Sequence, residues 1–189
     1  LGQILSAAGL EDSVLQTVKS REGKIRGACL EIALIINDWR AQSLGGMETA
    51  LMLWETCCVP SMLHGAGTWV EMNTNTEKRL NTLQCWFVRL VLQIGKGSVV
   101  SGLLWDTALL DFGIRVWIEK CMLVIHIRSL DEKTLARLTY DEQKDKQLPG
   151  LVKETRIICQ ELNIEDCNET QLNKSNFRSL LIKACHSKN

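Results

Sequence analysis

Apolar residues spaced three and four apart are the feature that most limits how this chain can fold, and residues 77–94 show it best. On a helical projection six apolar side chains of this segment share one face: Leu80, Leu83, Phe87, Leu90, Val91 and Ile94. The whole chain has two prolines and few alternating runs of β-branched residues, so helices are favoured nearly everywhere. The sequence therefore predicts a mainly α fold, a helical bundle, with room for a short strand remnant only in residues 1–9.

Further helices are predicted from the same spacing. One begins near Asp12 and continues through residues 25–44 until the Gly45-Gly46 pair, and residues 114–130 form a strongly apolar, central helix. Shorter helices are expected at residues 48–57, 98–110, 134–146, 149–162 and from Ser175. Residues 25–44 carry wider apolar faces than a free-standing bundle needs, so exposed apolar surface is expected there.

The distribution of charge and tryptophan separates the end of the chain from the rest. Residues 131–189 hold 20 charged residues, compared with 24 in residues 1–130. All six tryptophans lie between Trp39 and Trp117. We therefore expect residues 131–189 to form a charged helical appendage.

Overall charge argues against a protein that coats nucleic acid nonspecifically. The 189 residues hold 22 Lys and Arg and 22 Asp and Glu, whereas phosphate binding usually requires a positive excess. At 46% hydrophobic and 23% charged, the chain has the composition of an ordinary globular protein, which excludes disordered and collagen-like classes.

A local positive surplus nevertheless occurs in residues 77–105. Glu77 stands there against four cations: Lys78, Arg79, Arg89 and Lys96. Lys78 and Arg89 share a helix face with Trp86 at its border, and such a face can follow a phosphate backbone. The ordinary alternative is a solvated face of an amphipathic helix, and the tryptophans are more simply core anchors than base-stacking groups.

Catalytic motifs are not found in this sequence. It has no phosphate-binding glycine loop, no H-E-x-x-H, no nucleophile elbow and no Asp-Asp pair, and His64, His126 and His186 stand alone. No catalytic residues are therefore predicted.

The eight cysteines form no C-x-x-C pair. The best set for a metal is Cys159, Cys167, Cys185 and His186, whose spacing fits no standard zinc knuckle, so free thiols buried on helix faces are expected and no metal site is predicted. The chain opens without a signal peptide, and its longest uncharged stretch, residues 56–70, contains Pro60. We expect an intracellular protein, cytoplasmic or nuclear, neither secreted nor membrane-spanning.

Residues 58–69 read Cys-Val-Pro-Ser-Met-Leu-His-Gly-Ala-Gly-Thr-Trp. This segment resembles the V-x-P-x-L-L-Y-G-x-E-T-W signature that follows the catalytic palm in reverse transcriptases of non-LTR (LINE-type) retrotransposons. The matching residues are Val59, Pro60, Leu63, Gly65, Thr68 and Trp69, whereas His64 replaces the usual Tyr and Gly67 the usual Glu. The order of the surroundings agrees, from Leu1-Gly2, which resembles the end of the palm, to Leu148-Pro149-Gly150 in the helical region after the thumb.

The resemblance implies a domain order: residues 1–46 as a palm-end remnant with connecting helices, 47–130 as a thumb-like helical bundle, and 131–189 as the appendage. Pro60, Gly65 and Trp69 would be the structural signature that orients the thumb helix. Lys78, Arg79, Arg89 and Lys96 would contact nucleic acid.

The implied function is that of a C-terminal fragment of an RNA-directed DNA polymerase, which supports template–primer binding through the thumb and is not catalytic by itself. The parent enzyme would use two magnesium ions held by palm aspartates that this chain does not contain, so no cofactor is expected here. The implied partners are an RNA template, an RNA–DNA hybrid and the missing palm. The alternative function is a helical protein-interaction module without nucleic-acid binding.

Overall fold

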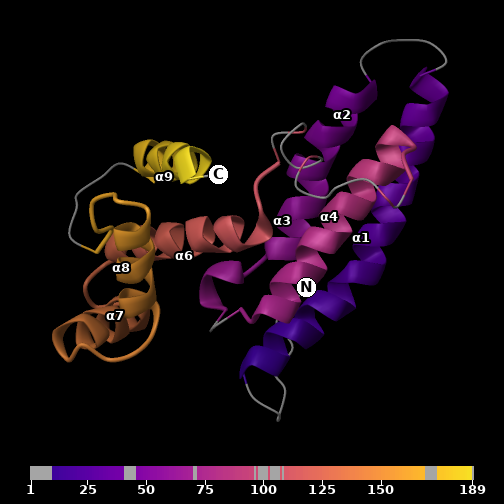
Figure 1. The fold of residues 1–189 in the computed structure, drawn as a ribbon. Helices are drawn as coiled ribbons and strands as arrows, with labels where there is room; N and C mark the ends of the chain where they lie inside the picture. Colours follow the sequence, from indigo (N-terminus) through magenta and orange to yellow (C-terminus); the bar gives the residue numbers. More distant parts are fainter. Residues whose placement is uncertain are drawn as a thin grey trace. The chain divides into compact units, whose positions relative to one another are not determined.

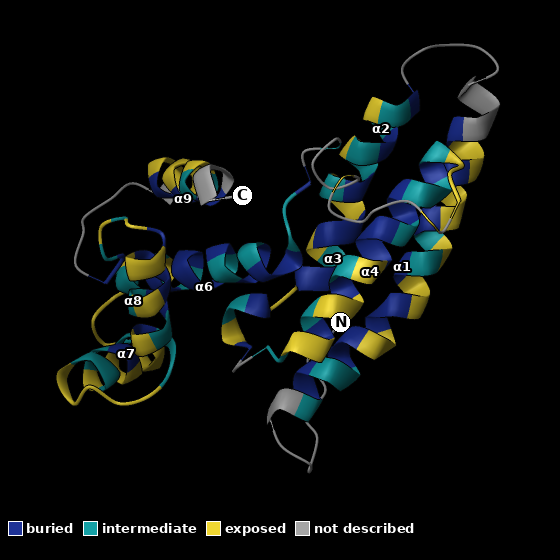
Figure 2. Cartoon of the chain, in the orientation of Figure 1, coloured by how far each residue is buried: buried dark blue, intermediate teal, exposed yellow. Residues whose placement is uncertain are grey.

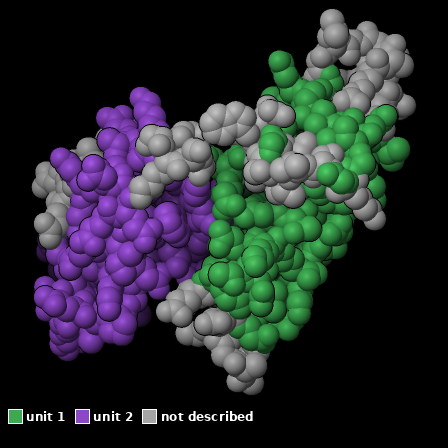
Figure 3. All heavy atoms as spheres, viewed as in Figure 1, with its two compact units in different colours: residues 1–65, 71–112 green, residues 66–70, 113–189 purple. Residues whose placement is uncertain are grey.

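The computed structural model describes residues 10–40, 46–69, 72–95, 97, 102, 107, 109–168 and 174–188. Within these residues every regular element is helical, which confirms the predicted mainly α fold. The strand remnant predicted in residues 1–9 and most of the helix predicted at 98–110 lie outside them. The chain divides into two compact units, unit 1 with residues 1–65 and 71–112, and unit 2 with residues 66–70 and 113–189 (Figure 3).

Unit 1 is built on one long helix, α1 (Leu10–Arg40), against which α2 (Gly46–Leu53), α3 (Val59–Leu63) and α4 (Thr74–Leu92) pack (Figure 1). The buried stripe of α1 repeats every three to four residues, because only that spacing keeps one side of a helix against its neighbours. It consists of Val14, Val18, Ile25, Cys29, Ile32 and Ile36. The single helix expected from Asp12 onward is thus confirmed, and Figure 2 shows its buried and exposed sides.

The helical path from α2 does not stop at Cys57, where the sequence predicted its end. The helix expected over residues 48–57 instead continues from α2 through a π-helical turn, Trp54–Cys58, directly into α3. In this wider turn the Val59 N–H donates to the carbonyl of Trp54, five residues back. Pro60 then falls in the first turn of α3, where a missing N–H leaves no hydrogen bond unmade.

Helix α4 is the predicted amphipathic helix, and local chemistry sets both its ends. Asn73 is the N-cap, and its side chain accepts a hydrogen bond from the Thr76 N–H at 2.8 Å. At the other end Gln93 adopts a left-handed conformation with φ 57° and donates its N–H to the Arg89 carbonyl. Leu80, Leu83, Phe87 and Val91 are buried as predicted, whereas Ile94 is exposed beyond the end of the helix.

Three aromatic rings form the centre of unit 1. Trp54 stacks on Phe87 with 4.6 Å between ring centroids, and Phe112 meets Trp54 edge-on at 6.4 Å. The buried amide of Gln84 accepts a hydrogen bond from the Trp54 indole at 3.3 Å and donates one to the Leu110 carbonyl at 3.1 Å. Gln84 therefore satisfies the polar edge of the stack and fastens residues 110–112 to α4.

A buried arginine joins α1 to the end of α3. Arg21 is 3% exposed, and its guanidinium donates hydrogen bonds of 2.8 Å to the carbonyls of Met62 and His64. The Met62 carbonyl lies in the last turn of α3 and the His64 carbonyl at its C-cap, and a cation is favoured at the carbonyl end of a helix. Burial lowers the pKa of Arg21 from its ordinary value, but an arginine still remains charged.

Unit 2 contains η2 (Ala66–Thr68), α6 (Phe112–Arg128), α7 (Leu135–Asp145), α8 (Leu151–Glu161) and α9 (Lys174–Lys188), with Phe112 itself counted in unit 1. Helix α6 is buried on most of its sides, as predicted for residues 114–130. The ammonium group of Lys120 on α6 is buried and pairs with Glu154 of α8. Helix α9 buries Phe177, Leu181 and Cys185, which lie four residues apart on one face.

The domain boundaries predicted at 46/47 and 130/131 stay predictions. The compact units divide at other positions, because the short segment 66–70 belongs with α6 to α9 although it lies between α3 and α4 in the chain.

Replacing Arg21 by methionine should destabilise unit 1 strongly. The substitution keeps most of the apolar stem and removes both charge-assisted hydrogen bonds, so we expect a loss of about 2–3 kcal/mol in the free energy of unfolding. Urea unfolding followed by tryptophan fluorescence measures it. Lys24→Met, which removes an exposed charge from the same helix, should change stability by less than about 0.5 kcal/mol. Equal losses in the two variants would contradict the role given to Arg21.

Candidate functional site

The segment from Val59 to Trp69 forms a short helix, a tight turn and a 3₁₀ turn. Helix α3 ends at Leu63 with His64 as its C-cap, Gly65 follows with φ 75°, and the Trp69 N–H donates to the Ala66 carbonyl at 3.0 Å. A positive φ of this size is costly for any residue except glycine, so Gly65 is required by the turn itself. Trp69 is buried, while the His64 side chain is exposed and only its carbonyl is used, by Arg21.

Gly67 lies against α6 so closely that no side chain fits. A Cβ atom at this position would approach the Glu119 carbonyl oxygen to 2.9 Å and the Leu123 Cβ to 3.0 Å. The glutamate that the resembling signature carries at this position is therefore excluded by the packing of unit 2.

The four cations predicted to bind nucleic acid have different surroundings. Lys78 and Arg79 are exposed on α4. Arg89 is half-buried with its Nε inside the protein, and Lys96 lies outside the described residues. The structure therefore leaves Lys78 and Arg79 exposed on α4, while Arg89 is drawn partly into the core beside Cys85. Burial raises the pKa of the Cys85 thiol, and the Arg89 guanidinium lowers it in part.

Arg79 does not stand alone, because α1 contributes a second set of charges. The Glu22 carboxylate accepts a hydrogen bond from Arg79 Nε at 2.5 Å through one oxygen and binds Arg26 at 2.8–2.9 Å through the other. The Arg26 guanidinium also lies 4.6 Å above the Trp86 ring of α4, a cation–π contact.

Lys19 belongs to the same stripe of α1, since residues 19, 22 and 26 are spaced three and four apart, and it is exposed. We call the set Lys19, Arg26, Lys78 and Arg79 the α1–α4 basic face; Glu22 lies within it. Sequence reasoning missed the two α1 members. Their spacing was visible, but nothing in the sequence pairs that stripe with α4.

Three buried thiols meet in unit 2. Cys121 comes from α6, Cys159 from α8 and Cys167 from the loop after α8, and their sulfur atoms all lie within 4.8 Å of one another. Thiol hydrogen bonds from Cys121 and Cys167 lower the pKa of Cys159, and the bond to Cys159 raises the pKa of Cys121. We call Cys121, Cys159 and Cys167 the thiol cluster.

The loop that carries Cys167 is held by buried polar contacts. Arg128 donates to the Cys167 carbonyl at 2.5 Å. The buried Asn168 side chain accepts from the Tyr140 hydroxyl at 3.0 Å and donates to Asp166 at 2.6 Å and to the Thr155 hydroxyl at 3.3 Å. Such a network fixes the backbone before and after Cys167, and with it the position of the Cys167 sulfur.

The cysteines follow the sequence prediction only in part. Seven of the eight are buried and all are free, as expected; Cys57 is exposed. Of the set considered for a metal, Cys159 and Cys167 do meet, but among the described residues their third neighbour is Cys121, not Cys185. The His186 side chain lies outside the described residues.

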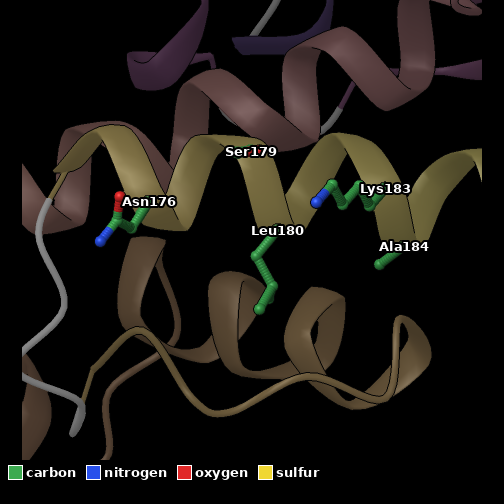
Figure 4. A pocket seen from close by; sticks show the side chains of 5 residues that line it. All are labelled: Asn176, Ser179, Leu180, Lys183 and Ala184. Carbon is green, nitrogen blue, oxygen red and sulfur yellow. The ribbon is translucent and has the colours of Figure 1, made fainter.

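The surface hollows offer little chemistry. A hollow of about 510 Å³ is lined by Asn176, Ser179, Leu180, Lys183 and Ala184, which all belong to α9 (Figure 4). A second, of about 240 Å³, lies between α1 and the segment Cys57–Ser61. Neither lining brings together the paired acid and base that catalysis needs.

Comparison of the chain with protein-family models, with curated proteins and with solved structures finds no match. In the described part of the chain, no helix combines the length and the apolar character needed to cross a bilayer. Any function assigned to this chain therefore depends on the geometry of its own residues.

Gly67→Ala tests the close packing of the signature segment. The added methyl group must displace the α6 backbone or Leu123, so we expect a loss of about 1–3 kcal/mol in stability. Gly27→Ala is the matched control, because a Cβ there meets nothing within 4 Å and alanine in a helix should add about 0.5–1 kcal/mol. Chemical denaturation followed by circular dichroism compares the stabilities of the two variants. An unchanged stability of Gly67→Ala would show that α6 accommodates the added methyl group without loss.

Proposed function

We propose that this chain is the thumb and post-thumb helical region of an RNA-directed DNA polymerase of the non-LTR retrotransposon type. In this proposal the α1–α4 basic face holds the template–primer duplex, and polymer synthesis belongs to a palm domain with two magnesium ions. The observation that carries the proposal is the basic face itself, joined across two helices by Glu22 and Trp86. The resemblance of residues 58–69 to the family signature supports it.

The basic face has the chemistry of a phosphate grip. Two of its four cations, Arg26 and Arg79, share the carboxylate of Glu22, and the other two, Lys19 and Lys78, are exposed. A guanidinium carries five N–H groups in a fixed fork. Glu22 accepts hydrogen bonds from only some of the N–H groups of Arg26 and Arg79. The remaining donors are oriented in advance, so less side-chain entropy is lost when a phosphate binds.

Contacts of this kind read a backbone and not a base sequence. A polymerase thumb must move along any template, so lysine and arginine donors without base-edge contacts suit that role. An RNA–DNA hybrid is recognised largely by its shape and by backbone contacts, which cations from two neighbouring helices can make.

Helix α1 also exposes an apolar stripe that supports a protein partner. Leu30, Leu34 and Ile35 are 48%, 66% and 47% exposed, in the segment where apolar surface was expected. We assign the palm domain as the occupant of this stripe. The second candidate, a helical protein-interaction module without nucleic-acid binding, is favoured by the same three side chains and needs no basic face.

Salt dependence of binding to an RNA–DNA hybrid tests the proposed grip. Each phosphate contact contributes about 0.7–0.9 to the slope of log K against log salt concentration. We therefore expect Lys19→Ala with Lys78→Ala to weaken binding severalfold at low salt and to reduce the slope by about 1.4–1.8. Fluorescence anisotropy of a labelled hybrid measures both quantities.

The control is Lys133→Ala with Lys153→Ala, which removes two exposed lysines from unit 2. If this control lowers the slope as much as the Lys19→Ala, Lys78→Ala variant does, the hybrid is attracted to surface lysines in general and the assigned face is wrong. Undetectable binding of the unmodified chain at low salt would reject the thumb proposal and leave the interaction module.

A further inference from the structure

The thiol cluster is assembled by folding from distant parts of the chain. Cys121 and Cys159 lie on two helices, and Cys167 follows in a loop, yet the three sulfur atoms are within 4.8 Å of one another. All three are buried, with at most 1% of any residue exposed. Three thiols converging on one point are a soft ligand set, the kind that selects zinc or copper(I) over magnesium or calcium.

The distances suit a metal with little rearrangement. Zinc–sulfur bonds of about 2.3 Å in a tetrahedral site place the sulfur atoms about 3.8 Å apart. Sulfur atoms that already lie within 4.8 Å reach such positions by side-chain rotations, without moving α6 relative to α8.

The surroundings of the cluster resemble an outer ligand shell. Metal-binding side chains are normally oriented by hydrogen-bonded neighbours. Here Asn168, the residue after Cys167, donates to the Thr155 hydroxyl, and Arg128 donates to the Cys167 carbonyl.

Charge favours a divalent ion. Three thiolates around Zn²⁺ carry one net negative charge, whereas around Cu⁺ they carry two, and buried charge that is not compensated is costly. The Arg128 guanidinium, bound to the Cys167 carbonyl at 2.5 Å, lies where it can offset a single negative charge.

We propose that Cys121, Cys159 and Cys167 bind one Zn²⁺ ion, which ties α6 to α8 and to the loop after it. Among the described residues the cluster offers three protein ligands, and the fourth tetrahedral position of the proposed site is open to water or another small ligand. The site is independent of the nucleic-acid proposal, since no member of the basic face belongs to unit 2.

Metal binding by the full chain, kept reduced, tests this site directly. We expect one equivalent of Co²⁺ to give sulfur-to-cobalt charge-transfer bands and the visible bands of tetrahedral cobalt, and Zn²⁺ to remove them. X-ray absorption of the zinc-loaded protein should show three sulfur neighbours at about 2.3 Å. Fewer than three sulfur neighbours, or no stoichiometric binding, would overturn the proposal, and this measurement needs no variant to fold.

Substitutions then assign the ligands. Cys121→Ser, Cys159→Ser and Cys167→Ser should each weaken zinc binding by about 100-fold or more, and Asn168→Ala by about 10-fold through the outer shell. The matched control is Cys29→Ser, which removes another fully buried thiol, hydrogen-bonded only to Cys58 among the thiols. Loss of binding in this control as well, with circular dichroism unchanged, would place the zinc elsewhere.

Discussion

The fold of unit 1 depends on a single buried cation. The Arg21 guanidinium bonds to the carbonyls of Met62 and His64 at the end of α3, where the chain turns at Gly65. Removing the donor from a buried carbonyl costs about 1–3 kcal/mol. The chain leaves unit 1 directly after this turn, since residues 66–70 belong to unit 2.

The helices were predictable because their signal is local. The spacing of apolar residues in α4 and α6, and the Asn73 cap, act within a few residues of each other. The bonds of Arg21 span 41 and 43 residues, and no pattern in the sequence marks an arginine as buried. The helix end predicted at Cys57 was wrong for a similar reason, since the π turn made by Trp54–Cys58 carries the chain directly into α3 and past Pro60.

The candidate sites divide in the same way. Lys78 and Arg79 were found from local charge, but Arg26 and Glu22 became visible only when α1 lay beside α4. For the thiols, Cys159 and Cys167 are near in sequence and were considered together. Cys121 lies 38 residues before Cys159 in the chain. Two cysteines that far apart can be recognised as neighbours only when it is known which helices pack together.

The neutral total charge of the chain is compatible with the proposed grip on a duplex. A phosphate interacts mainly with charges within about 8–10 Å at physiological salt, and at that range it meets the basic face and not the average over 189 residues. Glu22 shares its carboxylate between two arginines, so it lowers the local surplus by one while holding both guanidinium groups in place. A face of this size supplies only a few phosphate contacts, so it suits a domain that adds to the affinity of a neighbour and does not need to bind a duplex alone.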